Sequence, residues 1–210
     1  YFATGRASWL AIGLALVAVG GYAVYQISSK IQDRVANFID PFADFDGIGN
    51  QPANALIGLS WGGITGTGLG YGHPELVPVA HSDYILAAVG EELGFVGIAA
   101  VLCLFGIFIT RGFRTAMQTR DSYGKLLASG LSLTIAIQIF VVAGGVSAML
   151  PMTGLTTPFM SAGGSSVMAN YILLGLLLRI SNSANRPADY DAVAAGTAQR
   201  LGQAEVVGAR

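Results

Sequence analysis

Four long apolar runs constrain the fold of this chain more than any other feature of its sequence. They lie at residues 9–27, 84–109, 126–150 and 161–180. Each run approaches or exceeds the roughly 20 apolar residues that an α-helix needs to cross the hydrocarbon of a bilayer. A single run could be a core helix of a soluble protein, but four in succession predict an all-α, polytopic membrane helix bundle with four transmembrane helices.

Sparse charge agrees with a membrane location. Charged residues make up 11% of the 210-residue chain, which is less than half of the roughly 25% found in soluble domains. The net charge of −1 argues against a nucleic-acid partner, because such a partner requires a basic excess that neutralises its phosphates. The single cysteine, Cys103, lies in an apolar run and excludes a disulfide framework.

The basic residues predict how the spans are oriented. Nine of the eleven Lys and Arg residues lie before the first span, between the second and third spans, or at and beyond the end of the fourth. The connection over residues 28–83 holds only Lys30 and Arg34 and is acidic overall. Because cytoplasmic loops carry an excess of Lys and Arg, both ends of the chain are expected in the cytoplasm, and residues 28–83 and 150–160 outside it.

The first outer connection is too long to be a simple turn, and connections of such length are usually functional. Residues 51–60 (QPANALIGLS) are expected to form a short helix on the membrane surface. Residues 61–72 (WGGITGTGLGYG) alternate glycine with small or apolar residues, which favours tight turns over a packed surface. A phosphate-binding loop would need a preceding strand and a following Lys-Ser/Thr pair, and this sequence indicates neither.

Residues 73–95 (HPELVPVAHSDYILAAVGEELGF) concentrate the polar chemistry of the chain. They contain both histidines, and four carboxylates lie where the outer connection becomes the second span: Glu75, Asp83, Glu91 and Glu92. Acids at the mouth of a membrane helix are costly to hold there and are functional candidates by default. The alternative for Asp83 is that it caps the helix together with Ser82.

The remaining acids of this stretch point to different roles. Glu91 and Glu92 lie about 100° apart around a helix, so they cannot both face one cavity. Glu91 lies nearer the side of Asp83, whereas Glu92 is expected to pair with another helix. The spacing of the two histidines with Glu75 and Asp83 fits no tight metal-binding motif, so no metal site is predicted there.

The fourth span begins with a segment of small residues. The uncharged connection before it delivers two glycines and two serines to the helix start, namely Gly163, Gly164, Ser165 and Ser166. Free main-chain amides at a helix N-terminus, with adjacent hydroxyls, can bind an anion. The same residues are also typical of helix capping and close packing, and composition alone favours this second interpretation.

Four strings of the sequence resemble the SEDS family of shape, elongation, division and sporulation proteins. They are RVANFIDPFAD (34–44), GNQPANALIGLSWGGITGTGLGYG (49–72), VPVAHSDYILAAVGEELGFVG (77–97) and LPMTGLTTPFMSAGGSSVMANY (150–171). The resemblance implies that the spans are the last four of ten, and that residues 1–181 are the C-terminal part of a membrane domain that is inactive alone. Residues 182–210 are expected to form a disordered cytoplasmic tail. The last string favours the RodA branch over the FtsW branch.

The resemblance implies a peptidoglycan glycosyltransferase of the bacterial cytoplasmic membrane. Such an enzyme joins the disaccharide units of lipid II into glycan strands at the outer membrane face, for cell elongation, shape or division, and inverts the anomeric centre. Asp83, in AHSD (80–83), matches the essential acid of the family's AHTD-like motif and would be the general base. The implied partners are lipid II, membrane lipids and a class B penicillin-binding protein, which is a transpeptidase.

The leaving pyrophosphate of this reaction needs compensating charge. Lys30 and Arg34 are the only cations on the outer side of the predicted topology. Because two positive side chains are few for a pyrophosphate, a divalent cation, or cations from further spans, are expected to contribute. The sequence does not specify a cofactor. The expected substrate-binding residues are Lys30, Arg34, Glu75, His81, Glu91, Ser161, Gly163, Gly164, Ser165 and Ser166.

Two other functions are open from the sequence. A flippase for lipid-linked precursors would also use intramembrane acids, and a membrane scaffold could activate a transpeptidase through its outer loop. The carboxylates cluster at one membrane face and not along a path across the bilayer. This distribution favours surface chemistry over transport.

Overall fold

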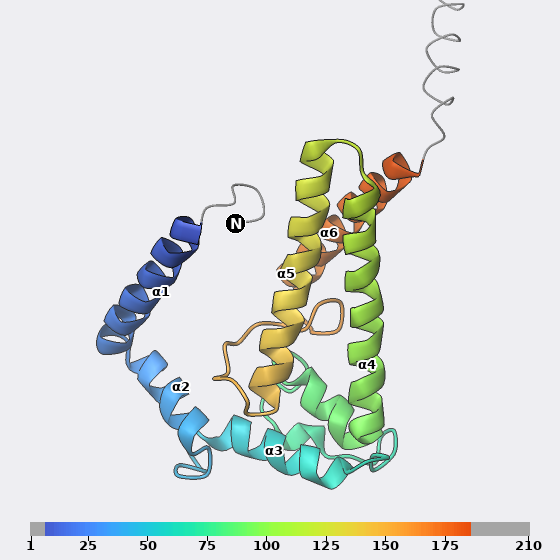
Figure 1. Ribbon diagram of the computed structural model, residues 1–210. Coiled ribbons are helices and arrows are strands. Elements are labelled where there is room, and N and C mark those ends of the chain that lie inside the picture. The colour runs from blue at the N-terminus through green and yellow to red at the C-terminus, as the bar shows by residue number, and fades with distance from the viewer. Residues whose placement is uncertain (1–6, 186–210) are drawn as a thin grey trace, which may run out of the picture. The chain divides into compact units, whose positions relative to one another are not determined.

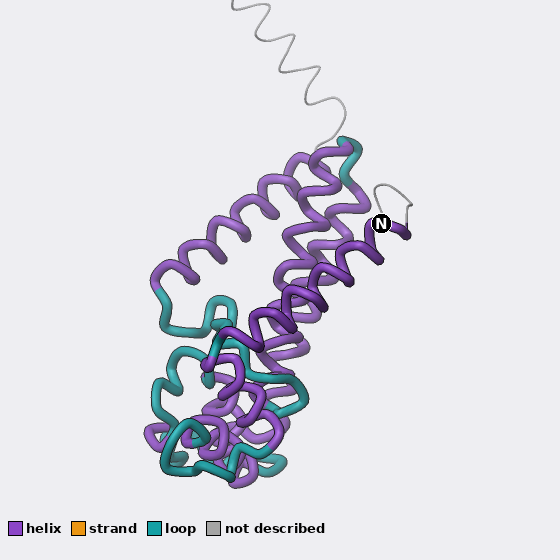
Figure 2. The backbone as a smooth tube through the Cα atoms, turned by 90° about the vertical axis from the view of Figure 1, so that its left-hand side faces the viewer, coloured by secondary structure: helices purple, strands orange, loops and turns teal. Residues whose placement is uncertain are grey.

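The computed structural model describes residues 7–185, and within that range every regular element is helical, as Figure 1 and Figure 2 show. The elements are α1 (Ala7–Ile27), α2 (Ser29–Ile39), α3 (Asn50–Gly62), the 3-10 turn η1 (Pro74–Leu76), α4 (Ile85–Gln118), α5 (Ser122–Val146) and α6 (Gly164–Ala184). The predicted all-α class is confirmed.

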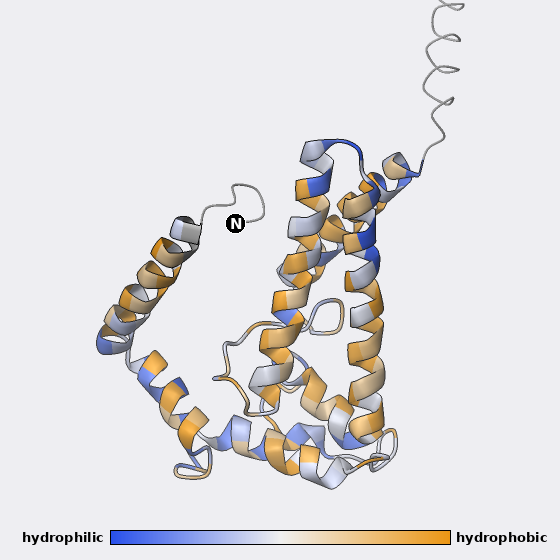
Figure 3. Cartoon of the chain, viewed as in Figure 1, coloured by the Kyte–Doolittle hydropathy of each residue, from blue (hydrophilic) through white to orange (hydrophobic). Residues whose placement is uncertain are grey.

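Length and apolar composition identify the candidate membrane spans. α4, α5 and α6 are each long and apolar enough to cross a bilayer, and hydrophobic residues line these helices in Figure 3. α1 and α2 are separated by a bend of 101°, and together they could form a fourth, broken span. The described part of the chain therefore holds three candidate spans, or four if the bent pair counts as one, in agreement with a polytopic membrane bundle.

The ends of the predicted spans differ in the structure, and most clearly in α4, α5 and α6. α4 continues to Gln118, well beyond the predicted end at residue 109, because the arginines that follow the apolar run are good helix formers. α5 runs from Ser122 to Val146 instead of from 126 to 150. Its C-terminal end comes early because the carbonyl of Gly144 accepts hydrogen bonds of 2.8 and 2.9 Å from two amides of the turn that follows.

α6 begins at Gly164, later than the predicted start at residue 161. The amide of Ser161 donates to the carbonyl of Thr157 at 3.1 Å, and the next amide donates to the carbonyl of His81 at 2.8 Å. These contacts hold the chain in a loop up to the glycines.

The C-terminal end of α6 also differs from the expectation. The helix ends at Ala184, so residues 182–184 form its last turn instead of the start of a tail. The rest of the expected tail, residues 186–210, lies outside the described residues.

The outer connection contains more helix than the sequence interpretation anticipated. α3 confirms the helix expected at residues 51–60, whereas α2 was not predicted. Its signal is the spacing of Ile31, Val35 and Phe38, because apolar residues at i, i+4 and i+7 lie on one face of a helix.

The chain divides into two compact units, and each has a core of its own. The first comprises the chain up to Leu104 together with Ile137–Val167, and the second comprises Phe105–Ala136 and the chain from Met168 onward. Buried residues of the first core are Ala55, Val77, Tyr84, Leu86, Ala87, Val142 and Val146, and those of the second are Ala116, Ala128 and Leu177. Every candidate site residue from the sequence belongs to the first unit.

The glycine-rich segment 61–72 packs on the first part of α4. At Gly94 the helix adopts φ 68° and ψ −167°, which breaks its regular hydrogen bonding. The amides of Thr67 and Gly68 donate to the carbonyls of Glu91 and Glu92, each at 3.0 Å. The loop thus satisfies main-chain groups that the break leaves free. This arrangement agrees with the tight turns over a packed surface that the sequence predicted.

Candidate active site

Asp83 lies two residues before the start of α4 and is half-buried. The hydroxyl of Ser82 donates a hydrogen bond of 2.8 Å to its Oδ1. The first carbonyl of the helical ladder is that of Tyr84, which accepts from the amides of Ala87 and Ala88 at 2.8 and 3.2 Å. Within residues 7–185, the carboxylate of Asp83 therefore accepts from a hydroxyl and not from a main-chain amide, which argues against the helix-capping alternative.

Asp83 and Arg34 line the same cavity, which has a volume of about 120 Å³. Arg34 comes from α2, and its Nη1 donates a hydrogen bond of 2.9 Å to the carbonyl of Met152 in the connection before α6. Gly154 of that connection also lines the cavity. A Cβ atom built on Gly154 would lie 3.2 Å from Nη2 of Arg34 and 3.4 Å from Oδ2 of Asp83. The carboxylate and the guanidinium therefore approach each other across this glycine.

The cavity also includes Tyr84, which lies just before α4 and is 5% exposed. Burial, followed by the charge of Asp83, raises the pKa of Tyr84 to about 12, and the charge of Arg34 opposes the rise. The phenol is therefore neutral at pH 7, and Asp83 is the one carboxylic acid among the described residues that line this cavity.

Ser161 connects the segment before α6 to the main chain next to Asp83. Its side chain is 3% exposed, and its Oγ donates to the carbonyl of Ser82 at 2.6 Å while it accepts from the amide of Thr157 at 2.7 Å. Both bonding capacities of the hydroxyl are used inside the fold. Ser161, which the sequence assigned to substrate binding, is hydrogen-bonded to the backbone from which Asp83 projects.

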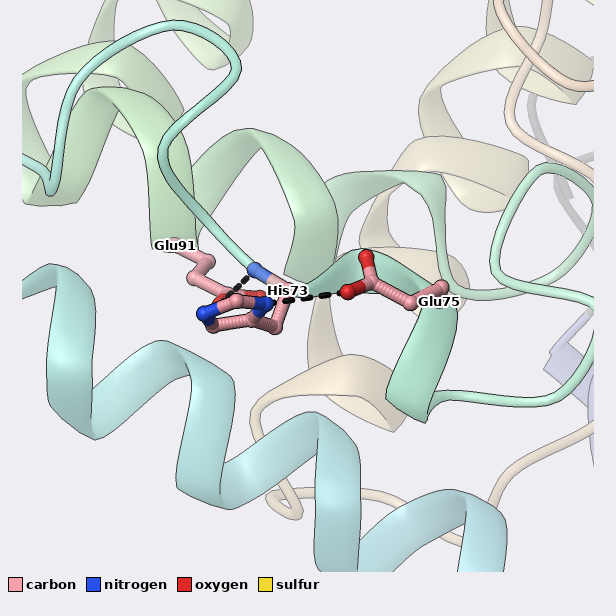
Figure 4. Close-up of polar contacts among 3 residues, drawn as sticks. All are labelled: His73, Glu75 and Glu91. Atoms are coloured by element: carbon pink, nitrogen blue, oxygen red, sulfur yellow. Dashed lines mark hydrogen bonds and ion pairs between the residues drawn. The ribbon is translucent and has the colours of Figure 1, made fainter.

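Two other candidates, Glu75 and His81, line a second, larger hollow whose lining does not include Asp83. Its volume is about 600 Å³, and Glu75, His81 and Glu92 are among its lining residues. Oε1 of Glu75 and Nδ1 of His73 are hydrogen-bonded at 2.9 Å, as Figure 4 shows. That hydrogen bond, ahead of all other causes, lowers the pKa of Glu75. Glu75 and His81 are thus near the site in sequence but open onto a different hollow from Asp83.

Glu91 is engaged in packing. It is 2% exposed, and its Oε1 accepts a hydrogen bond of 2.6 Å from the main-chain amide of His73 (Figure 4). A Cβ atom on Gly58 of α3 would lie only 2.9 Å from its Oε2. The carboxylate therefore joins α4 to the glycine-rich loop and lies against α3. Glu91 is among the lining residues of neither hollow.

The small residues at the start of α6 do not join the Asp83 cavity. The hydroxyls of Ser166 and Thr156 are hydrogen-bonded at 2.6 Å, and Gly164 and Ser165 are exposed. Gly163 to Ser166 and Lys30 are absent from the lining of both hollows. Of the ten expected substrate-binding residues, Arg34 is the one that shares a cavity with Asp83.

The described residues do not assemble a metal site. Across residues 7–185, no three side chains of His, Cys, Asp or Glu come together in a group that could hold a metal ion. A divalent cation, which the sequence interpretation left open, would find no set of three such protein ligands in this part of the chain.

The fold and the cavity define a helical membrane protein with a carboxylate facing a cation at the N-terminal boundary of a candidate span. A family model for cell cycle proteins, FtsW, RodA and SpoVE, matches residues 1–186. The chain belongs to this family, the SEDS family that four strings of its sequence resemble.

Curated relatives place the chain within that family. It is 57% identical over 187 residues to the peptidoglycan glycosyltransferase RodA of Mycobacterium tuberculosis (strain ATCC 25618 / H37Rv), covering 89% of this chain and 40% of the relative. It is 35% identical over 184 residues to the probable peptidoglycan glycosyltransferase FtsW of Geobacter sp. (strain M18), covering 86% of this chain and 50% of the relative. The higher identity to RodA agrees with the branch that the sequence favours.

A solved structure shares the fold. Its description reads "Structural coordination of polymerization and crosslinking by a peptidoglycan synthase complex". One chain of that structure aligns with a TM-score of 0.64 and 28% identity, over 86% of this chain and 50% of that chain. The chain thus spans about half the length of the proteins that it matches, or less.

Proposed function

We propose that the whole protein containing this chain is a peptidoglycan glycosyltransferase that polymerises lipid II, with Asp83 as its general base. The observation that carries the proposal is the half-buried carboxylate of Asp83 facing the guanidinium of Arg34 in one cavity. The names of the RodA and FtsW relatives support the same reaction class.

The reaction needs a base on one side and a cation on the other. The 4-hydroxyl oxygen of one sugar attacks the anomeric carbon of another, and the bond from that carbon to the lipid pyrophosphate breaks. The hydroxyl proton passes to Asp83, a transfer that typically contributes 10²- to 10⁴-fold to the rate. The leaving pyrophosphate takes the electron pair, and Arg34 is suited to stabilise its charge because a guanidinium matches phosphate geometry.

The cavity has room for the reacting groups and not for a whole disaccharide, because a volume of about 120 Å³ corresponds to only a few water molecules. The remaining sugar and lipid are expected to lie outside it, along the membrane boundary. In the proposed orientation Asp83 faces the outer side of the bacterial cytoplasmic membrane, and a class B penicillin-binding protein is the proposed partner. The likeness to a chain from a peptidoglycan synthase complex that coordinates polymerization and crosslinking supports a partner of that kind.

The test uses the full-length protein in liposomes supplied with lipid II on one side. Asp83→Asn keeps the shape of the side chain and removes its basicity, so polymer formation should fall by at least about 10²-fold. Insertion and lipid II binding, measured separately, should stay near the wild-type level.

Three results would contradict the proposal in different ways. Robust glycan synthesis by the Asn variant would remove Asp83 from catalysis. Movement of lipid II across the bilayer without polymer formation would favour the flippase. Polymer formation that depends wholly on the catalytic residues of an added transpeptidase would favour the scaffold.

A further inference from the structure

Gly154 lies beside both the proposed base, Asp83, and the proposed cation, Arg34. Its φ angle is +73°, and it lines the cavity together with Asp83 and Arg34. The chain on its N-terminal side is fixed, because the carbonyl of Met152 accepts the hydrogen bond from Nη1 of Arg34. The position of Gly154 is therefore coupled to the position of the cation.

A single methyl group at this position would fill the gap. It would lie 3.4 Å from Oδ2 of Asp83, which is ordinary contact, and 3.2 Å from Nη2 of Arg34, which is slightly tight. The cavity could accept the methyl with a small shift of the arginine. The space beside both polar atoms would then hold a carbon in place of a substrate oxygen.

We propose that Gly154 keeps the site open, because its missing side chain leaves the space in which a sugar hydroxyl or phosphate oxygen contacts Asp83 and Arg34. This inference rests on the proposed function. A residue with a side chain would leave both the base and the cation in place and would block the approach of the reacting oxygen between them.

The positive φ by itself favours glycine at this position, and the chain offers a control for that effect. Gly70 has φ +74° and no atom within 4 Å of a built Cβ. Alanine at Gly70 or at Gly154 would be strained in both cases by a positive φ of nearly the same size, because the strain comes from the Cβ and the neighbouring backbone. Only the alanine at Gly154 would also enter the gap between carboxylate and guanidinium.

The experiment compares Gly154→Ala with Gly70→Ala in the full-length protein, with lipid II polymerisation and thermal stability measured for both. Both variants should lose a similar amount of stability. Gly154→Ala should lose about 10²-fold in kcat/KM, the scale expected when reacting groups are displaced by about 1 Å, and Gly70→Ala should polymerise like the wild type. Equal turnover of the two variants would overturn the inference.

The outcomes also separate this inference from the proposed function. An inactive wild type under conditions that support lipid II binding would refute the polymerase and, with it, the substrate assigned to the gap. An active wild type with an active Gly154→Ala variant would refute the role of Gly154 alone.

A second comparison covers the case in which Gly154→Ala does not fold. Asparagine adopts a positive φ more readily than alanine, so Gly154→Asn should fold while its side chain still enters the gap. Its turnover should fall well below that of Gly70→Asn, and equal turnover of these two variants would also overturn the inference.

Discussion

The hydroxyl of Ser161 donates a hydrogen bond of 2.6 Å to the main-chain carbonyl of Ser82. The hydroxyl of Ser82 in turn donates to the carboxylate of Asp83. Two short bonds thus connect the segment before α6 to the proposed base. These bonds hold the carboxylate of Asp83 in position before substrate binds. The carboxylate therefore loses less conformational freedom on binding.

Ser161→Ala should lower both stability and turnover. It leaves the buried amide of Thr157 and the carbonyl of Ser82 without their partner, so unfolding should become easier by about 1–3 kcal/mol. Ser60→Ala is the matched control, because its hydroxyl also donates to a carbonyl at 2.7 Å but on an exposed helix surface. Thermal unfolding and lipid II turnover of both variants test this. Wild-type kcat in Ser161→Ala would show that the bond does not position Asp83.

Arg34, and not Lys30, should be the outer cation that acts on the substrate. Both side chains are exposed, but Arg34 lines the Asp83 cavity and Lys30 does not. Arg34→Met should reduce kcat/KM by about 10- to 100-fold, the scale of a lost charge-assisted hydrogen bond, and Arg34→Lys should fall between it and wild type. The check is to measure the steady-state kinetics of the Arg34 variants, with Lys30→Met as the control. A larger loss in Lys30→Met would reverse the assignment.

Glu91 should prove structural. Glu91→Ala removes the acceptor of the His73 amide and should destabilise the protein by about 1.5–3 kcal/mol. Glu91→Gln keeps an oxygen at that position, so it should cost less and leave turnover per folded molecule unchanged. Thermal unfolding and polymerisation by purified protein separate the two effects. A stable but inactive Gln variant would return Glu91 to the substrate site.

The outer connection should be extracytoplasmic. Tyr71 in that connection and Tyr123 at the start of α5 are 80% and 73% exposed, so each can be replaced by cysteine with Cys103→Ala removing the native thiol. An impermeant maleimide should label Tyr71→Cys from outside cells whose outer envelope admits the reagent, and label Tyr123→Cys only after lysis. The opposite pattern would invert the proposed orientation.

The sequence by itself determined the class of protein and the residue at the centre of the proposed site. Long apolar runs, sparse charge and glycine-rich turns act over short distances along the chain, so the long helices and the turns of residues 61–72 could be predicted from local pattern. The cost of a carboxylate at the mouth of an apolar helix marks all four acids of residues 73–95, and Asp83 was singled out among them because AHSD (80–83) matches a motif of the family. The helix ends were less accurate, because capping and loop contacts set them.

Only the tertiary structure decided which residues share the site with Asp83. Arg34 reaches the cavity because α2 lies against the connection that contains Gly154, and no local pattern encodes that approach. Glu91 and Ser161 were candidates by sequence, yet the fold uses their polar atoms to bind main-chain groups of distant segments. The physical reason is that a buried polar atom must find a partner, and long-range packing alone determines whether that partner is the protein or its substrate.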